Sequence, residues 1–395
     1  MKKVVLAFSG GLDTSYCAIY LNKEVGLEVY SVLVNTGGFS EQELEKIERK
    51  AYALGVKHHQ TIDVTDQYYQ QCIRYLVYGN VLRNGTYPLS VSAERVFQAR
   101  AIAEYANQIG ADYIAHGSTG AGNDQVRFDM IFNILSPQAE ILTPIRDQQI
   151  SREQEIRYLK QKGIRFNAEK MQYSINQGLW GTSIGGKETL TSHLPLPETA
   201  YPTKQTARRA ESVTLHFSDG EFTSYNDRTF SSGVEAIRAL ESLAGPFGIG
   251  RDIHVGDTII GMKGRVGFEA AAPILLIKAH QALEKHTLTK WQIYWKDQLA
   301  NWYGMMLHEG QFLDPVLRDI EHYLEHSQQN VTGRVHVRLM PGTFHIEGIE
   351  SEHDLMSPQF GTYGEMNLGW SGQDVRGFAK IMANQSRIYR AVNKK

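Results

Sequence analysis

The stretch Ala7-Phe8-Ser9-Gly10-Gly11-Leu12-Asp13-Thr14-Ser15 joins a hydrophobic run at residues 4–8 to a segment with helical spacing at residues 14–22. A buried strand followed by two glycines, several hydroxyls and a helix is the arrangement that a bound phosphate requires. Glycines let backbone N–H groups approach the anion, and the helix N-terminus adds unpaired donors and a partial positive charge. The stretch therefore predicts a phosphate site at the end of the first strand.

The side chains of this stretch fit the same site. Ser9, Thr14 and Ser15 can donate hydrogen bonds to phosphate oxygens, and Asp13 can reach a Mg²⁺ ion held on the phosphates. The spacing is not the G-x-G-x-x-G of dinucleotide-binding folds, and the lysine of a Walker A loop is missing. A tight strand-to-helix turn without a ligand is the alternative interpretation, but the unbroken run of glycines, hydroxyls and carboxylate favours the phosphate site.

Length and composition describe an ordinary globular protein: 395 residues allow two or three domains, with 42% hydrophobic and 21% charged residues. The net charge of −2 gives no electrostatic footprint for nucleic acid. No signal peptide precedes the first strand, and no apolar run approaches the ~20 residues that span a bilayer. Two cysteines, Cys17 and Cys72, indicate a reducing compartment. We expect a cytoplasmic protein with no nucleic-acid or membrane partner.

The first part of the chain alternates between strands and helices through short loops. This alternation predicts right-handed βαβ units and a doubly wound parallel sheet. Ligands on such sheets bind at the carboxyl ends of the strands, so the loops after Phe8, Val34 and His116 should share one cleft. The expected strands cover residues 4–8, 28–34, 59–64 and 113–116, and the expected helices cover 14–22, 40–54 and 93–109, with capping boxes formed by Ser40 with Glu43 and by Ser151 with Gln154.

Two loops of this region, at residues 84–92 and 117–128, carry polar side chains beside glycines or a proline. They could be ordinary polar surface loops. Glycines that free backbone donors beside an Asp and an Arg also suit a substrate with an amine and carboxylates. Asp124 could hold the ammonium, Thr119 and Asn123 could hold carboxylate oxygens, and Arg127 could bind a second carboxylate bidentately.

The first stretch resembles the S-G-G-x-D-[ST] loop of ATP pyrophosphatases, which split ATP between the α and β phosphates. Together with Tyr87-Pro88-Leu89, Ser92 and the segment at residues 116–128, it resembles the argininosuccinate synthase family. The resemblance implies an AMP-forming C–N ligase of arginine biosynthesis, which converts ATP, citrulline and aspartate to argininosuccinate, AMP and pyrophosphate through a citrullyl-adenylate. It also implies an adenine nucleotide alpha-hydrolase-like fold, Mg²⁺ carried by ATP with no metal site of the protein, and a homotetramer.

The resemblance also assigns roles to residues of this sequence. Asp13 and Arg95 are expected to act in catalysis. Arg95, on the first turn of its helix, is expected to face the reacting phosphate or a carboxylate, with a surface ion pair as the alternative. No residue stands out as a general base. The ATP-binding residues are expected to be Ala7, Phe8, Ser9, Gly10, Gly11, Leu12, Asp13, Thr14, Ser15, Val34 and Gly117; citrulline is expected at Tyr87, Ser92, Asn123, Arg127, Ser174 and Ser183; aspartate is expected at Thr119, Asn123 and Asp124.

The alternating pattern stops near residue 170, which divides the chain into a nucleotide-binding domain at 1–168, an α+β synthetase domain at 169–365 and a helical tail at 366–395. Residues 181–187 imitate a Walker A loop, but Glu188 stands where the Mg²⁺-binding hydroxyl belongs, so we reject a second nucleotide site. In the resembling family a glutamate and a tyrosine that contact citrulline flank a G-M-K segment. Gly256 and Phe268 occupy those positions here, and neither can make the polar contact. Glu269 is interpreted as a solvated strand end.

The second half also contains periodic segments. Hairpins are expected at 213–224 and 331–346, a helix at 234–243 and a strand at 259–268. Trp291, Trp295, Leu299, Trp302 and Met306 recur at helical spacing, which is typical of a helix core or a subunit face. The apolar positions of a helix at 374–392 predict packing on a neighbouring subunit. The histidines at 58, 59, 280 and 286 lack metal-ligand spacing.

Three alternative functions stay open at this point. Transfer RNA thiolation would require a pair of sulfur-carrying cysteines and a basic surface, and an amidotransferase would require a nucleophilic-cysteine domain; neither is visible. A nucleotide sensor without turnover would require no second and third substrate pocket, whereas two polar loops are present.

Overall fold

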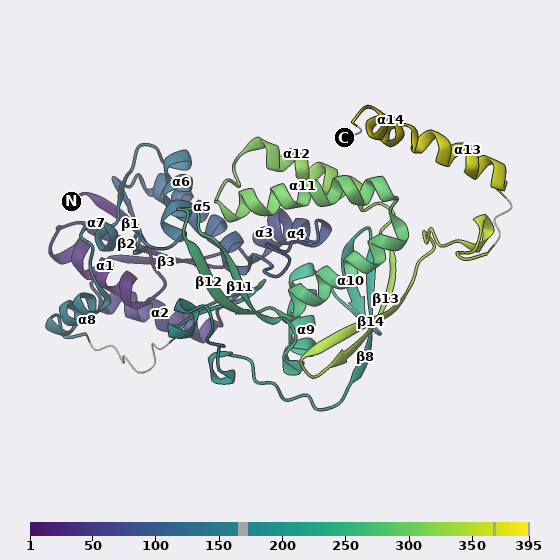
Figure 1. The fold of residues 1–395 in the computed structure, drawn as a ribbon. Helices are drawn as coiled ribbons and strands as arrows, with labels where there is room; N and C mark the ends of the chain where they lie inside the picture. Colours follow the sequence, from purple (N-terminus) through teal and green to yellow (C-terminus); the bar gives the residue numbers. More distant parts are fainter. Residues whose placement is uncertain (165–172, 366–368, 394–395) are drawn as a thin grey trace.

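The computed structural model describes residues 1–164, 173–365 and 369–393. Figure 1 shows three parts: an N-terminal α/β body, a second body of antiparallel strands and helices, and a tail that projects away from both. The expected boundaries at 168/169 and 365/366 fall on or next to residues outside the described ranges, so the divisions stay predictions. The mixed α/β architecture itself is confirmed.

The N-terminal body is built on a five-stranded, all-parallel sheet in the order β3-β2-β1-β4-β5. The order reverses between β1 and β4, which is the switch point at which ligands bind on doubly wound sheets. Alternate residues of β1 face opposite layers: Val5 packs in the core on the α5 side, whereas Val4 and Leu6 pack with α1. The strands are β1 Lys3–Ala7, β2 Glu28–Asn35, β3 His58–Asp63, β4 Tyr113–Ala115 and β5 Glu140–Leu142.

Helices cover both faces of this sheet, as the alternating pattern predicts. Both predicted capping boxes are present, at Ser40 with Glu43 and at Ser151 with Gln154. Each box satisfies backbone N–H groups that the first helical turn leaves unpaired. The helices are α1 Leu12–Lys23, α2 Glu41–Ala53, α3 Thr65–Tyr68, α4 Arg74–Tyr78, α5 Ser90–Ile109, α6 Asp124–Leu135, α7 Pro144–Asp147 and α8 Arg152–Gln161, and a π-helical turn Tyr69–Ile73 joins α3 to α4.

The second body contains two antiparallel sheets, in the orders β10-β9-β8-β13-β14 and β11-β12-β7-β6. Both predicted hairpins are confirmed, as β8–β9 and β13–β14. The strand expected at 259–268 begins later, because Thr258 and Met262 close a turn that joins β11 to β12. The strands are β6 Ser174–Gly178, β7 Gly181–Gly185, β8 Glu211–Ser218, β9 Glu221–Tyr225, β10 Arg228–Thr229, β11 Arg251–Asp257, β12 Lys263–Glu269, β13 Gly333–Met340 and β14 Thr343–Glu350.

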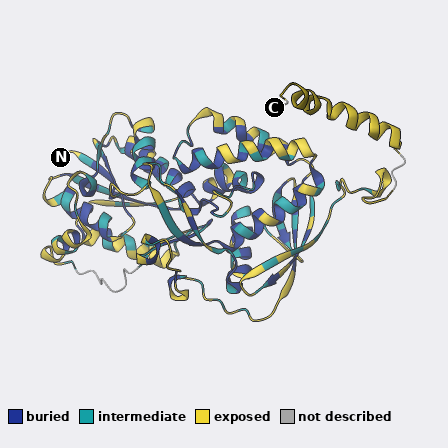
Figure 2. Ribbon diagram, in the orientation of Figure 1, coloured by how far each residue is buried: buried dark blue, intermediate teal, exposed yellow. Residues whose placement is uncertain are grey.

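Four long helices follow in this half of the chain: α9 Gly233–Ala244 and α10 Ala271–Thr287 pack on these sheets, whereas α11 Lys290–His308 and α12 Pro315–Ser327 pack on each other and on α5 and α4. The aromatic stripe lies on α11, as predicted, but Trp291, Trp295 and Trp302 are 57–62% exposed. Figure 2 shows exposed stretches along α11. The subunit-face interpretation therefore fits these side chains better than the core interpretation.

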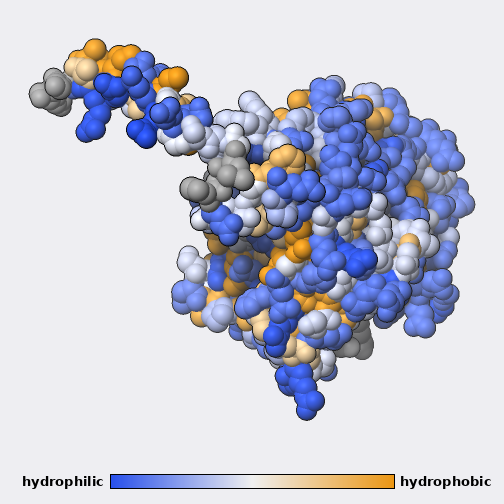
Figure 3. Space-filling model, turned by 90° about the vertical axis from the view of Figure 1, so that its right-hand side faces the viewer, coloured by the Kyte–Doolittle hydropathy of each residue, from blue (hydrophilic) through white to orange (hydrophobic). Residues whose placement is uncertain are grey.

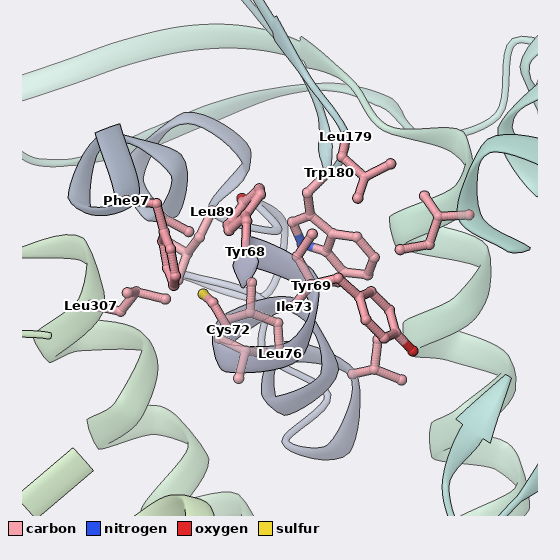
Figure 4. Packing of buried hydrophobic residues seen from close by; sticks show 14 of the residues in the cluster. Tyr68, Tyr69, Cys72, Ile73, Leu76, Leu89, Phe97, Leu179, Trp180 and Leu307 are labelled. Atoms are coloured by element: carbon pink, nitrogen blue, oxygen red, sulfur yellow. The ribbon is translucent and has the colours of Figure 1, made fainter. Parts of the chain in front are cut away.

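One continuous apolar core joins the two bodies. Figure 4 shows Trp180, which precedes β7, within a cluster of side chains from the helices at residues 65–78. The indole N–H of Trp180 donates to the carbonyl of Pro88 at 2.8 Å, so the turn between β6 and β7 is tied to the loop before α5. This junction positions the second body over the carboxyl end of the parallel sheet.

The tail consists of two helices, α13 Gly372–Met382 and α14 Asn384–Val392, where a single helix is predicted. All of its described residues are exposed, and Figure 3 shows apolar side chains gathered on one side of it. Within the described residues, none of the helices is both long and apolar enough to cross a bilayer.

Candidate active site

The glycine loop after β1 has the backbone that the sequence predicts. Gly10 has a φ of +72°, which an L-residue rarely adopts, and Gly11 is the N-cap of α1. The Ser15 hydroxyl donates to the Gly11 carbonyl at 2.6 Å, which closes the loop. A Cβ on Gly117 would lie 3.2 Å from the carbonyl carbon of Asp13, so the loop after β4 approaches α1 as closely as a glycine allows. The N-terminus of α1 therefore opens between the ends of β1 and β4.

A cavity of about 710 Å³ lies at this edge of the sheet. The ends of β1, β2 and β4 all line it, which confirms the prediction that their loops share one cleft. Residues that precede or form β6 close the opposite side. The predicted site residues that line the cavity are Ala7, Phe8, Ser9, Gly11, Leu12, Asp13, Thr14, Val34, Arg95, Gly117, Thr119, Asn123, Asp124, Arg127 and Ser174.

Five other predicted residues do not line this cavity: Gly10, Ser15, Tyr87, Ser92 and Ser183. Tyr87 and Ser183 are both buried, and their hydroxyl oxygens are 2.9 Å apart. The Ser92 hydroxyl lies 3.0 Å from Arg127 Nη2. Ser92 is therefore connected to the cavity through Arg127, whereas Tyr87 and Ser183 form a separate buried pair.

Two arginines hold the Asp124 carboxylate at the start of α6. Arg95 Nε and Arg127 Nη1 each donate to one of its oxygens, at 2.9 Å. These guanidinium groups lower the pKa of Asp124, although burial acts in the opposite direction. Arg95 lies in the second turn of α5 rather than the first, since that helix begins at Ser90. It also donates to Asn176 Oδ1 at 2.8 Å, and its side chain is 13% exposed, so the alternative of a surface ion pair is wrong.

Glu94 is a site residue that the sequence analysis did not single out. Its side chain accepts hydrogen bonds from Thr36 at 2.9 Å and from Arg95 at 3.0 Å. Burial raises the pKa of Glu94 to about 7, and the Arg95 guanidinium opposes that change. In the sequence Glu94 simply precedes Arg95, and adjacent acidic and basic residues are common on exposed helices. The sequence therefore provided little indication that Glu94 is a buried site residue.

His308, at the end of α11, is the second residue that sequence reasoning did not find. Its Nδ1 lies 3.0 Å from Ser92 Oγ, and its carbonyl accepts from Arg127 Nε at 2.9 Å. Burial and the neighbouring Arg127 charge hold its pKa well below the usual value, so the ring is neutral. Its partners, Arg127 and Ser92, lie far earlier in the chain. No local sequence pattern could therefore have identified His308 as a site residue.

The loop before α6 connects to the second body through Asn123, whose amide oxygen accepts from the backbone N–H of Ile259 at 2.8 Å. Thr119 and Ser174 are solvent-accessible cavity residues. The predicted aspartate-binding residues Thr119, Asn123 and Asp124 therefore lie together on one loop and the helix that follows it.

Asp13 lies against a second carboxyl group, Glu155 on α8. Burial, followed by the charge of Asp13, raises the pKa of Glu155 to about 8, and its Oε2 has no partner among the described hydrogen bonds. Glu155 is 2% exposed and does not line the cavity, whereas the Asp13 carboxylate does and supplies the kind of oxygen ligand that Mg²⁺ prefers. The donor set therefore fits a magnesium ion carried on the phosphates.

The structure also shows the surroundings of the divergent positions. Phe268 is 1% exposed and meets the Tyr87 ring edge-on at 5.4 Å. The interpretation of Glu269 as solvated is wrong: it is 6% exposed, and its carboxylate accepts from the Thr203 backbone and hydroxyl. The strand end is buried because the connector at residues 198–205 folds over it.

A parallel sheet with helices on both faces, whose glycine loop and helix N-terminus open into a cavity, defines a nucleotide-binding α/β domain. The arginosuccinate synthase N-terminal HUP domain model matches residues 3–165, and the arginosuccinate synthase C-terminal domain model matches residues 173–389. The chain belongs to the argininosuccinate synthase family.

Named relatives agree with this assignment along the whole chain. Argininosuccinate synthase of Methanocaldococcus jannaschii is 36% identical over 98% of this chain and 97% of its own length. That of Xanthomonas campestris pv. campestris is 36% identical over 100% of this chain and 99% of its own. The Saccharolobus solfataricus protein of the same name is 35% identical over 99% of each.

Proposed function

We propose that this protein condenses citrulline with aspartate at the expense of ATP, forming argininosuccinate, AMP and pyrophosphate. The observation that carries the proposal is the single cavity that brings the glycine loop of β1, the Asp124–Arg127 cluster and Ser174 together. A nucleotide sensor would have no use for this second, polar compartment beside the phosphate loop.

The reaction has two balanced steps. The ureido oxygen attacks the α-phosphorus of ATP; an O–P bond forms, the bond to the β-phosphate oxygen breaks, and pyrophosphate leaves. The aspartate ammonium then loses one proton, its nitrogen attacks the ureido carbon, and the C–O bond to AMP breaks. A second proton leaves the new guanidinium nitrogen. The intermediate converts a poor leaving oxygen into AMP, which is a good leaving group.

The protein's contribution is positioning and charge stabilisation. The amides around Gly11 and the hydroxyls of Ser9 and Thr14 would hold the departing pyrophosphate. Val34 and Gly117 would flank the adenosine. Mg²⁺ carried by ATP would neutralise phosphate charge, and Asp13 would be the residue that reaches it.

The two amino acids would occupy the remainder of the cavity. Asp124 would bind the aspartate ammonium, with Thr119 and Asn123 on its carboxylates. Arg127 and Ser174 would bind the ureido substrate from the cavity. The hydroxyls of Tyr87 and Ser183 would contact it once the hydrogen bond between them opens, and Ser92 would position Arg127.

We also propose that the protein is a homotetramer in the cytoplasm. The exposed apolar side of α13 and α14 and the exposed tryptophans of α11 are surfaces that a second copy would cover. The free, buried thiols of Cys17 and Cys72 support a reducing compartment.

The test is pyrophosphate release from Mg-ATP with citrulline and aspartate each added or withheld. Release that requires citrulline, with AMP and argininosuccinate accumulating when aspartate is present, is the expected result. Release that requires neither amino acid, or ATP binding without any release, would contradict the proposal and favour the sensor.

A further inference from the structure

Four charged side chains of the cavity lining form one hydrogen-bonded row. Asp124 binds one guanidinium group at each of its oxygens, those of Arg127 and Arg95. Arg95 Nη1 then donates to Glu94 Oε1 at 3.0 Å. The row therefore alternates in sign, and its two carboxylates balance its two guanidinium groups.

Arg95 is shared between these two carboxylates. Its other hydrogen bonds with described residues go to the neutral amide oxygens of Gln98 and Asn176, both at 2.8 Å. Glu94 and Asp124 therefore divide the compensation of the Arg95 charge between them. If Glu94 were neutral, Asp124 would have to compensate both guanidinium groups of the row.

Asp124 is the member of the row that can also bind a substrate cation. Its side chain is 35% exposed, and a carboxylate offers about four lone-pair sites, so there is room for an ammonium group beside the two guanidinium groups. The proposed function, on which this inference rests, places the aspartate ammonium there. An ammonium group in contact with Asp124 is repelled by both guanidinium groups, and a second carboxylate that balances one of them weakens this repulsion.

Glu94 is held firmly in place behind Arg95. It is 2% exposed, and its Oε2 accepts from the hydroxyl of Thr36, which follows β2, at 2.9 Å. A Cβ on Gly178 would overlap the same oxygen, so the turn between β6 and β7 packs directly on the carboxylate. With its oxygens bound to Thr36 and Arg95, this carboxylate influences a substrate through the Arg95 charge.

We propose that Glu94 is a positioning residue of the aspartate site. Its negative charge balances Arg95, which leaves Asp124 able to bind the ammonium group of aspartate. The strength of ammonium binding therefore depends on whether Glu94 is ionised.

The ionisation of Glu94 changes near neutral pH, because burial raises its pKa to about 7. Besides Arg95 and Asp124, the described titratable groups that act on it are Tyr68 and Tyr87; burial raises the pKa of both phenols, so they stay neutral. Its contacts from the loop after β2 and from β6 are uncharged. Glu94 is therefore ionised above pH 7 and gains a proton as the pH falls, which leaves the row with a net positive charge.

The test measures argininosuccinate formation with aspartate varied, at saturating Mg-ATP and citrulline, in the wild type and in E94Q. Succinate, which has the two carboxylates of aspartate without the amine, serves as a competitive inhibitor. E94Q keeps the shape of the side chain and removes its charge, so the KM for aspartate should rise at least tenfold, whereas the Ki for succinate should stay the same or fall. A ratio of these two constants within threefold of the wild-type ratio would overturn the inference, because a merely structural role weakens both ligands alike.

The pH profile tests the same charge without removing the carboxylate. From pH 8 to pH 6 the wild-type KM for aspartate should rise several-fold, whereas that of E94Q should stay flat. T36V removes a hydrogen bond that favours ionised Glu94, so the rise should begin at a higher pH. E104Q, which changes a 55% exposed glutamate of the same helix, is the matched control and should follow the wild type. Equal profiles for the wild type and E94Q would contradict the inference.

These outcomes are distinct from a failure of the proposed function. If the wild type forms no argininosuccinate from citrulline, aspartate and Mg-ATP, the proposed function fails. Wild-type turnover with an unchanged KM for aspartate in folded E94Q contradicts only the role of Glu94. If E94Q does not fold, the T36V profile still tests the charge, and a profile equal to that of the wild type would contradict its role.

Discussion

Arg95 Nε and the Asp124 carboxylate form a 2.9 Å ion pair that joins α5 to the first turn of α6. The same carboxylate binds Arg127, so one acidic side chain organises two arginines at the centre of the cavity. Charge-assisted contacts of this kind fix geometry as well as charge. Both amino-acid sites therefore depend on this one cluster. Substitutions of Asp124 and Arg127 should show which residue binds which amino acid.

Arg127→Ala should raise the KM for the ureido substrate, and Asp124→Ala should raise the KM for aspartate. Each loss should be on the order of 2–4 kcal/mol in kcat/KM, because a partly buried charge pair loses one member. Steady-state kinetics with each substrate varied measures both. Arg100→Ala, which removes a partly exposed arginine of the neighbouring helix α5, is the control and should stay near wild type. Near-wild-type kinetics for Arg127→Ala would contradict the assignment of Arg127 to the substrate site.

Gly117→Ala should weaken ATP binding by about tenfold or more. The new Cβ would lie 3.2 Å from the Asp13 backbone and Cβ, so the loop after β4 must move away from the phosphate loop. The KM for ATP measures the effect. Gly348→Ala on β14, where a Cβ meets nothing within 4 Å, controls for the loss of a glycine. An unchanged KM for ATP in Gly117→Ala would show that this approach does not position the nucleotide.

The pKa of Glu155, raised to about 8 from 4.5, predicts how stability depends on pH. The folded protein binds the Glu155 proton more tightly than the unfolded chain does. Its stabilising contribution is therefore complete below about pH 4.5 and is lost as the pH rises toward 8, by at most ~1.4 kcal/mol per pH unit. Glu155→Gln should flatten this dependence in magnesium-free denaturant unfolding between pH 5 and 8.

The exposed Glu153 on the same helix supplies the control for that experiment. Glu153→Gln should leave the slope of unfolding free energy against pH close to that of the wild type. Equal slopes in the wild type and Glu155→Gln would mean that the buried carboxyl does not hold its proton.

The local part of the site could be predicted from the sequence, because the chain itself supplies it. The order strand, Gly10, Gly11, helix places phosphate donors without reference to the rest of the molecule. Asp124 and Arg127 lie three residues apart on one helix, so their pairing is also local. Motif spacing therefore identified the cavity and about half of its lining residues.

Contacts between distant segments could not be predicted in the same way. His308 reaches Arg127 only after α11 packs against α5, and Glu94 reaches Thr36 across the sheet edge. Glu269 became buried because a connector without regular periodicity covers it. In each case the partner is set by the packing of the two bodies, and hydrophobic periodicity carries no information about it.

Removing residues 366–395 should reduce the oligomer to smaller species, because the apolar side of α13 and α14 has no cover within one chain. Size-exclusion chromatography with light scattering measures the mass of the full-length and shortened proteins. A monomer mass for the full-length protein at micromolar concentration would contradict the proposed tetramer.

The central claim is that the ureido oxygen attacks the α-phosphorus of ATP in this cavity. The most direct measurement uses citrulline labelled with ¹⁸O at the ureido position, with Mg-ATP and aspartate, followed by mass spectrometry of the AMP formed. The account predicts one ¹⁸O atom in each AMP and none in pyrophosphate. Unlabelled AMP accompanied by argininosuccinate, or no AMP under any condition, would contradict it.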